Sequence, residues 1–189
     1  WLVIVATLVA FAIALAGLVL GVQKQFFPAA SRPELLVDLW LANGSSLKAT
    51  EAQAKKVEAL LGEPEMRRSI RYYASYLGNG SPRFYLPLDQ QLFNDGFAQF
   101  VITTQDIDAR EDLKRRLEQR FADADGEWSG LRTRVLRLEN GPPVGFPVLF
   151  RVSGDDLGEL RRVAAEVAAV MRTHPYLREV NFDWNELGK

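Results

Sequence analysis

The chain has 189 residues, with 23 basic and 24 acidic side chains, one histidine and no cysteine. A formal net charge of −1 excludes a strongly basic nucleic-acid-binding protein. The lack of cysteine excludes thiol chemistry, disulfides and thiolate metal sites, and His174 alone cannot build a multi-histidine metal site. We therefore expect no metal centre and no cofactor.

Residues 1–27 are predicted to hold a transmembrane helix. Trp1 to Val22 contains no charged residue, and apolar side chains occur all round the expected helix. At about 1.5 Å per residue, such a run crosses a hydrocarbon core of about 30 Å. A long buried core helix and an uncleaved signal anchor are the alternatives. Lys24, the only charge beside the span, weakly favours a soluble part outside the cytoplasm.

Residues 28–139 are predicted to form one α+β domain in the order βαββαβ. Alternating apolar residues indicate strands, helical spacing indicates helices, and Thr50 with Gln53 matches a capping box. This order favours a ferredoxin-like domain, a four-stranded antiparallel sheet with two helices on one face. The expected elements are a strand at 35–41, a helix at 50–62, strands at 70–77 and 97–103, a helix from Asp108, and a strand at 131–138.

Residues 140–189 begin a second unit of the same kind. After a connector rich in Gly and Pro, the pattern predicts a strand at 148–153, a helix at 156–172 and a strand at 177–184. This is the first βαβ half of a second domain without its return half. Since the chain also begins with Trp and not Met, we expect it to be truncated at both ends.

The residues on this scaffold favour neither catalysis nor RNA binding. An acylphosphatase-like enzyme needs an arginine in the loop after the first strand, and residues 42–46 contain none. An RNA-binding sheet needs a basic central strand, and residues 97–103 contain no basic side chain. Several carboxylates are expected at helix starts or on exposed faces, where solvation and pairing with the helix dipole account for them: Glu51, Glu58, Asp106, Asp108, Glu111 and Asp112. We predict that the protein is not an enzyme.

The segment from Gly78 to Gly96 is the feature that calls for a functional interpretation. It joins two strands that a short hairpin could connect, and it is rich in aromatic and large apolar residues. Disorder fits this composition poorly. One interpretation is a flap that covers a sheet edge or is buried under a neighbouring domain. The other is a mobile, aromatic wall of a site for apolar ligands.

Four stretches, in their order and spacing, resemble the inner-membrane permease of resistance-nodulation-cell-division (RND) efflux pumps. They are FFP at 26–28, RPELLVD at 32–38, PRFYLPLDQQ at 82–91 and RLENGPPVGFP at 137–147. The resemblance covers nearly the whole chain. It implies the seventh membrane helix, the first porter subdomain of the second periplasmic loop, and the opening half of the next porter subdomain.

The family implies a proton-driven antiporter in the bacterial inner membrane, with its soluble part in the periplasm. Such permeases are homotrimers that work with a periplasmic adaptor and an outer-membrane channel, and they export amphiphilic or toxic compounds in multidrug resistance. The proton relay lies in membrane helices outside this chain. A signal-anchored periplasmic interaction or adaptor module is the alternative. Whether the exported compounds are drugs, lipids or metal ions does not follow from the sequence.

The resemblance also makes residues 78–96 the family's switch loop, which separates two substrate pockets. This loop departs from well-studied drug pumps because it is extended and contains Pro82 and Pro87, so substrate range is not carried over. The implied substrate-binding residues are Tyr76, Phe84, Tyr85, Phe93, Phe97 and Phe100, and the implied hinges are Gly78, Gly80 and Gly96.

Overall fold

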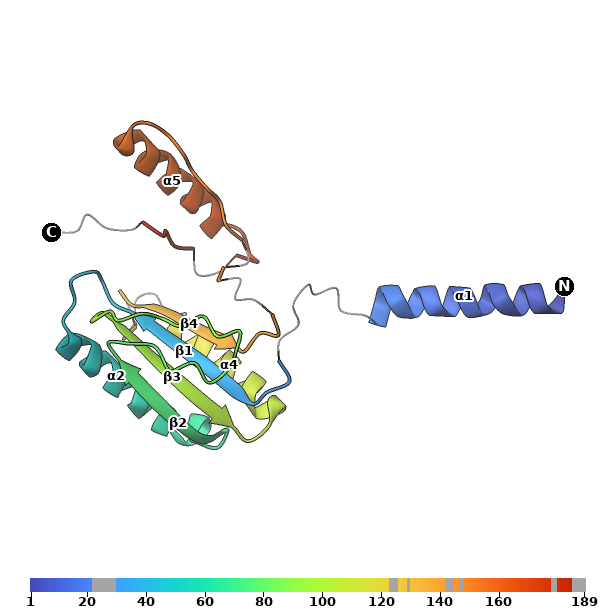
Figure 1. The fold of residues 1–189 in the computed structure, drawn as a ribbon, viewed down its shortest axis with the longest axis horizontal. Helices are drawn as coiled ribbons and strands as arrows, with labels where there is room; N and C mark the ends of the chain where they lie inside the picture. The colour runs from blue at the N-terminus through green and yellow to red at the C-terminus, as the bar shows by residue number, and fades with distance from the viewer. Residues whose placement is uncertain are drawn as a thin grey trace.

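The computed structural model describes residues 1–21, 30–122, 126–128, 130–141, 145–146, 148–177 and 180–184. The stretch quoted at 26–28 lies outside these residues, as do residues 142–144 and 147 of the stretch quoted at 137–147. Helix α1 (Leu2–Gly21) stands apart from the rest of the chain (Figure 1). None of its residues is buried, so it is not a core helix. By length and composition α1 can cross a membrane, although an N-terminal signal sequence meets the same criteria.

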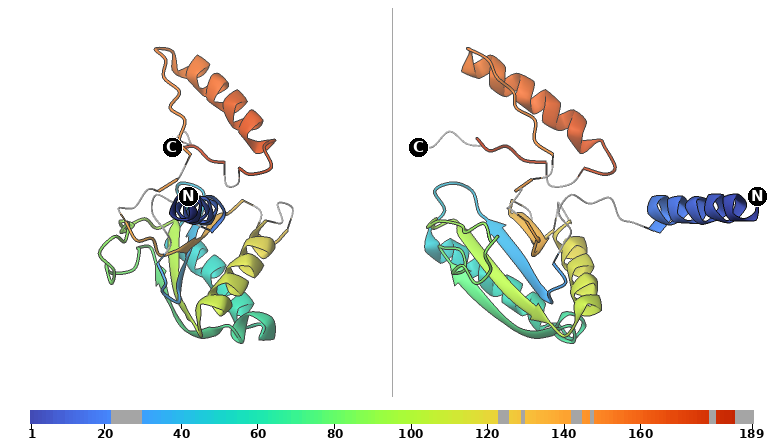
Figure 2. Two further views of the ribbon diagram at one scale, coloured as in Figure 1. Left: turned by 90° about the vertical axis from the view of Figure 1, so that its right-hand side faces the viewer. Right: turned by 45° about the vertical axis from the view of Figure 1, so that its right-hand side comes forward.

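A four-stranded antiparallel sheet confirms the predicted α+β fold. The strands lie in the order β2-β3-β1-β4, and every neighbouring pair is antiparallel. Helices α2 and α4 lie on the same face of the sheet, as both views in Figure 2 show. The elements are β1 (Glu34–Trp40), α2 (Leu47–Gly62), α3 (Pro64–Arg67), β2 (Ile70–Leu77), β3 (Phe97–Thr104), α4 (Ile107–Phe121) and β4 (Arg132–Arg137).

The hydrophobic core lies between the sheet and these two helices. Side chains alternate along a strand, so Leu35, Val37 and Leu39 of β1 share the face that meets the helices. Val57 of α2 and Leu117 of α4 belong to the same buried cluster. Because burial of one such side chain contributes about 1.5–3 kcal/mol, this cluster holds the sheet and helices together as one unit.

The two helices predicted for the domain, which are α2 and α4, both begin earlier than predicted. Ser46, not Thr50, is the N-cap of α2, and its hydroxyl accepts a hydrogen bond from Ala49 N. The Thr50 hydroxyl instead donates to the carbonyl of Asp95 at a distance of 2.5 Å. This hydrogen bond joins α2 to the end of segment 78–96. Helix α4 is capped by Asp106, two residues before the predicted start. The capping-box prediction is therefore wrong, because Thr50 lies one turn inside the helix.

Residues 30–32 are fixed to the domain by a buried arginine. Arg110 of α4 is 5% exposed, and its guanidinium donates to the carbonyls of Ala30 at 2.8 Å and Arg32 at 2.6 Å. The Ala30 N–H donates to the Leu138 carbonyl at 2.7 Å. The chain is thus bonded both to α4 and to the residue after β4 before β1 begins.

The last third of the chain forms one of its three predicted elements. Helix α5 (Leu157–Arg172) forms as predicted, with Asp156, the first residue of the predicted range, as its N-cap. Residues 148–153 form no strand, nor do 177 and 180–184, while 178–179 fall outside the described part. A strand needs a neighbour for its N–H and C=O groups, and the described residues supply none here. Both strand predictions therefore fail within these residues, and Leu149 and Phe150 are exposed.

Candidate functional site

Segment 78–96 lies over the face of the sheet opposite the helices, which we call the open face (Figure 1). Its position explains why β3 is buried along almost its whole length. Helices cover Ala98, Phe100 and Ile102 on one side, while the segment shields Gln99 on the other. The segment is therefore a flap, but it covers a face of the sheet and not the sheet edge that the sequence interpretation named.

Backbone hydrogen bonds hold the two ends of the segment, residues 78–80 and 91–97, close together, and we call this part the neck. Gly78 N donates to the Phe97 carbonyl at 2.8 Å, Asn94 N to the Gly78 carbonyl at 2.9 Å, and Gly80 N to the Gln91 carbonyl at 3.2 Å. A side chain does not fit at Gly80, since a Cβ would lie 2.9 Å from the Gln91 carbonyl oxygen. Gly78 has φ +70°, a conformation that glycine adopts without strain.

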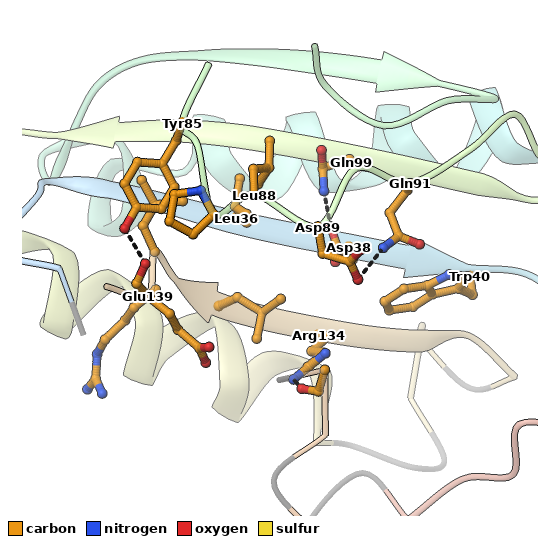
Figure 3. A pocket seen from close by; sticks show the side chains of 15 residues that line it. Leu36, Asp38, Trp40, Tyr85, Leu88, Asp89, Gln91, Gln99, Arg134 and Glu139 are labelled. Carbon is orange, nitrogen blue, oxygen red and sulfur yellow. Dashed lines mark hydrogen bonds between the residues drawn. The ribbon is translucent and has the colours of Figure 1, made fainter. Parts of the chain in front are cut away.

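Tyr85 fastens the middle of the segment to the far edge of the sheet. Its hydroxyl donates to the Glu139 carbonyl (Figure 3). The same hydroxyl lies 3.1 Å from Asn140 Oδ1. The ring and the buried Leu88 join a small apolar cluster on the open face. The Arg32 guanidinium lies 5.4 Å from the ring centroid. In this conformation Tyr85 is an anchor of the segment.

A second attachment runs through a buried carboxylate. Asp38 of β1 is 4% exposed, and its Oδ1 accepts from Gln99 Nε2 at 2.7 Å (Figure 3). Gln99 Oε1 in turn accepts from Ser81 N at 2.8 Å, so the amide side chain links the carboxylate to the segment. Burial raises the pKa of Asp38 to about 6, against the opposing effects of the Gln99 hydrogen bond and the nearby Arg134 charge.

Two hollows remain on the open face, one on each side of the segment. The Asp38 pocket, about 80 Å³, lies over β1 and β4 and includes Trp40, Gln91 and Arg134 (Figure 3). The Tyr76 groove, about 270 Å³, lies over β2 and β3. The groove is lined by Glu34, Tyr72, Ala74, Tyr76, Pro82, Phe84, Val101 and Thr103.

The structure brings together only part of the predicted binding set. Tyr76 and Phe84 line the Tyr76 groove, and Phe84 is 41% exposed. Phe93 is 76% exposed at the neck, where its ring lies 3.7 Å from the position of a Gly78 Cβ. Phe97 is buried against Trp40, with ring centroids 5.3 Å apart.

Phe100 lies on the other side of the sheet. It is fully buried in the core formed with the helices, because even-numbered residues of β3 point away from the open face. Phe100 therefore does not share a pocket with the other candidates in this conformation. Among the predicted hinges, Gly96 has an ordinary backbone, and a Cβ there would lie 3.4 Å from Asn94 Oδ1.

Sequence reasoning missed the polar residues beneath the segment. Asp38 interrupts the apolar stretch of β1, and Gln99 interrupts that of β3. The register pairs these two residues, so both side chains point to the open face. The sequence signal that could have found them is a polar residue in the middle of each of two predicted apolar strands.

The described residues contain no group of three or more His, Cys, Asp or Glu side chains that could hold a metal ion. Of the two methionines, Met66 is buried in the core and Met171 lies on α5. The hollows of the open face thus present aromatic rings, carboxylates and amides.

No family model matches the sequence, and no curated protein matches it. Two crystal forms of a heavy metal efflux pump share the fold, with TM-scores of 0.58 and 0.57 and identities of 17% and 19%. The aligned parts cover 96% and 95% of this chain and 19% of the pump chain in each case. A dimeric ferredoxin-like protein from an uncultured marine organism aligns with 61% of this chain and 96% of its own, at 11% identity and a TM-score of 0.36.

Proposed function

We propose that this chain is part of an efflux permease of the RND class, in which α1 crosses the inner membrane and the sheet domain is a periplasmic porter subdomain. One observation carries the proposal. A membrane-length apolar helix and the following α+β domain together share the fold of a heavy metal efflux pump over 96% of this chain. The four RND-like stretches of the sequence support the same assignment.

The chain spans about a fifth of the length of that pump, so the activity and partners of the whole protein are proposals. We propose a proton-driven homotrimer that works with a periplasmic adaptor and an outer-membrane channel. In this assembly the described domain moves substrates by changing conformation and performs no bond chemistry.

For the substrate, we propose amphiphilic organic compounds, although the pump of similar fold is named for heavy metals. Soft metal ions are held by thiolate or thioether ligands. The chain has no cysteine, and neither of its methionines, Met66 or Met171, lines the Tyr76 groove. The groove offers Tyr72, Tyr76 and Phe84, whose rings supply apolar area and adaptable contacts.

Alanine substitutions at Tyr76 and Phe84 test this proposal in the complete protein encoded by the reading frame that contains this chain. Expressed in an efflux-deficient bacterium, the double variant should export two unlike dyes more slowly, and unequally, at normal membrane abundance. Leu86→Ala is the matched control, because Leu86 belongs to the same segment, is 84% exposed and lies outside the groove.

Three outcomes contradict the proposal. Unchanged efflux of both dyes at normal abundance removes the groove from the transport path. An equal loss in the Leu86→Ala control shows that the segment is sensitive to any truncation. A reading frame with a start codon just before Trp1 and a stop after Lys189 favours the alternative, a signal-anchored periplasmic adaptor.

A further inference from the structure

Segment 78–96 covers a carboxylate that no cation neutralises through a direct hydrogen bond among the described residues. Asp38 lines its pocket together with Tyr85, Leu88 and Asp89 of the segment. Its one hydrogen bond there comes from the neutral amide of Gln99. If the segment lifts, water reaches this side chain.

We propose that segment 78–96 is a proton-operated cover, which protonation of Asp38 holds closed on the sheet and ionisation of Asp38 releases. This inference goes beyond the proposed transport function, because it concerns the segment and the sheet alone. It also does not depend on the identity of any substrate.

The energetic link follows from the burial itself. Burial raises the pKa of Asp38 from 3.8 to about 6, and release of the segment reverses that burial. The closed state therefore binds the proton more tightly than the released state, so acid favours closure. The pKa of Asp38 in the closed state is about 2 above its value in the released state. This difference changes the ratio of closed to released molecules by about 100-fold over the full titration.

The charged groups around Asp38 determine the pH at which its carboxyl group titrates. Arg134 and Arg132 of β4 lower its pKa, and Asp89 of the segment raises it. Arg137 and Glu139 also line the pocket. Asp89 moves with the segment, so its repulsion acts on Asp38 only in the closed state.

Ser81 provides a direct reporter of the cover. It is 1% exposed, its N–H donates to Gln99, and its Oγ has no partner among the described residues. The natural chain has no cysteine, so Ser81→Cys places a single small, buried thiol within the segment. That thiol becomes accessible to a reagent when the segment is released.

The experiment measures labelling of Ser81→Cys by a pyridyl disulfide in the full chain, held in detergent micelles, from pH 5 to pH 8. Gln119→Cys, at an exposed site on α4, corrects for the effect of pH on the reagent and thiolate. Val57→Cys, in the core, reports global unfolding. Relative to Gln119→Cys, labelling at position 81 should rise about tenfold from pH 5 to pH 8 and level off above about pH 6.

Asp38→Asn should abolish that rise, and Asp95→Asn, an exposed acid on the same segment, should leave it unchanged. Two further variants keep the test decisive if Asp38→Asn fails to fold. Asp89→Asn should move the plateau to lower pH, and Arg134→Gln should move it to higher pH.

Three results would overturn the proposal: a pH-independent ratio in the wild-type background, an unaltered rise in Asp38→Asn, or a plateau that neither neighbouring variant moves. Equal labelling rates at positions 81 and 57 would also overturn it, because the thiol would then be exposed by global unfolding.

Discussion

Replacing Asp38 by asparagine should stabilise the folded chain at neutral pH. The side chain is 4% exposed, and its pKa is raised from 3.8 to about 6 mainly by burial. An acid whose pKa is higher in the folded state favours folding below pH 3.8, and this contribution is lost as pH rises through 6. Asparagine keeps the oxygen that accepts from Gln99 and carries no charge.

The size of the effect follows from the two pKa values. The pKa of Asp38 rises from 3.8 to about 6, and each pKa unit corresponds to about 1.4 kcal/mol. At pH 8 the variant should therefore be more stable than the wild type by about 3 kcal/mol. At pH 4 the same comparison gives less than about 1 kcal/mol, because Asp38 is then mostly protonated in the fold. Taking the difference between variant and wild type cancels the titration of carboxylates that do not interact with Asp38.

Urea unfolding of both proteins in the same detergent, followed by tryptophan fluorescence at pH 4, 6 and 8, measures this difference. The gap between the two free energies of unfolding should widen as pH rises. A variant less stable than the wild type at pH 8 would refute the reasoning. It would mean that attraction to Arg134 and Arg132 outweighs the loss of water around the carboxylate.

Three other predictions concern the segment and the membrane helix. Leu88→Ala should lower the free energy of unfolding by about 2–4 kcal/mol, measured with urea, because Leu88 is 6% exposed in the open-face cluster; a change below 0.5 kcal/mol would contradict this. Gly80→Ala should lower the melting temperature because its Cβ meets the Gln91 backbone, whereas Gly96→Ala, with room for a methyl group, should change it little; equal effects would be inconsistent with the neck geometry. A reporter fused after Lys189 should be active only in a form that works in the periplasm, and activity of a cytoplasm-specific reporter alone would oppose the proposed topology.

The sheet domain was largely predictable because its strands and helices carry clear periodic patterns. Strand β2 was predicted with its observed ends, Ile70 and Leu77, and the order of elements limited the topology to one common arrangement. Helix starts were predicted less accurately, because Ser46 and Thr50 are both residue types that cap helices. In the fold Ser46 caps α2, whereas the Thr50 hydroxyl is bonded to the carbonyl of Asp95, which the sequence does not place nearby. No strand forms at 148–153, nor at the described residues 177 and 180–184, because periodicity indicates which face is apolar but not whether a partner strand is present.

The candidate site was harder to predict because its residues depend on side-chain direction and on distant contacts. The family resemblance grouped Phe84 with Phe100, although the alternation of side chains along β3 places Phe100 in the core. The anchoring role of Tyr85 depends on Glu139, which follows far along the chain. Asp38 and Gln99 become neighbours only through the register of β1 and β3.

The buried guanidinium of Arg110 determines how the domain responds to a mechanical load. A hinge needs a backbone that can rotate without breaking bonds, but the carbonyls of Ala30 and Arg32 are both held by helix α4. The Ala30 N–H is held at the end of the sheet by Leu138. A hinge at residues 30–32 would have to break these hydrogen bonds, so a pull that reaches Ala30 acts on α4 and on the end of the sheet together.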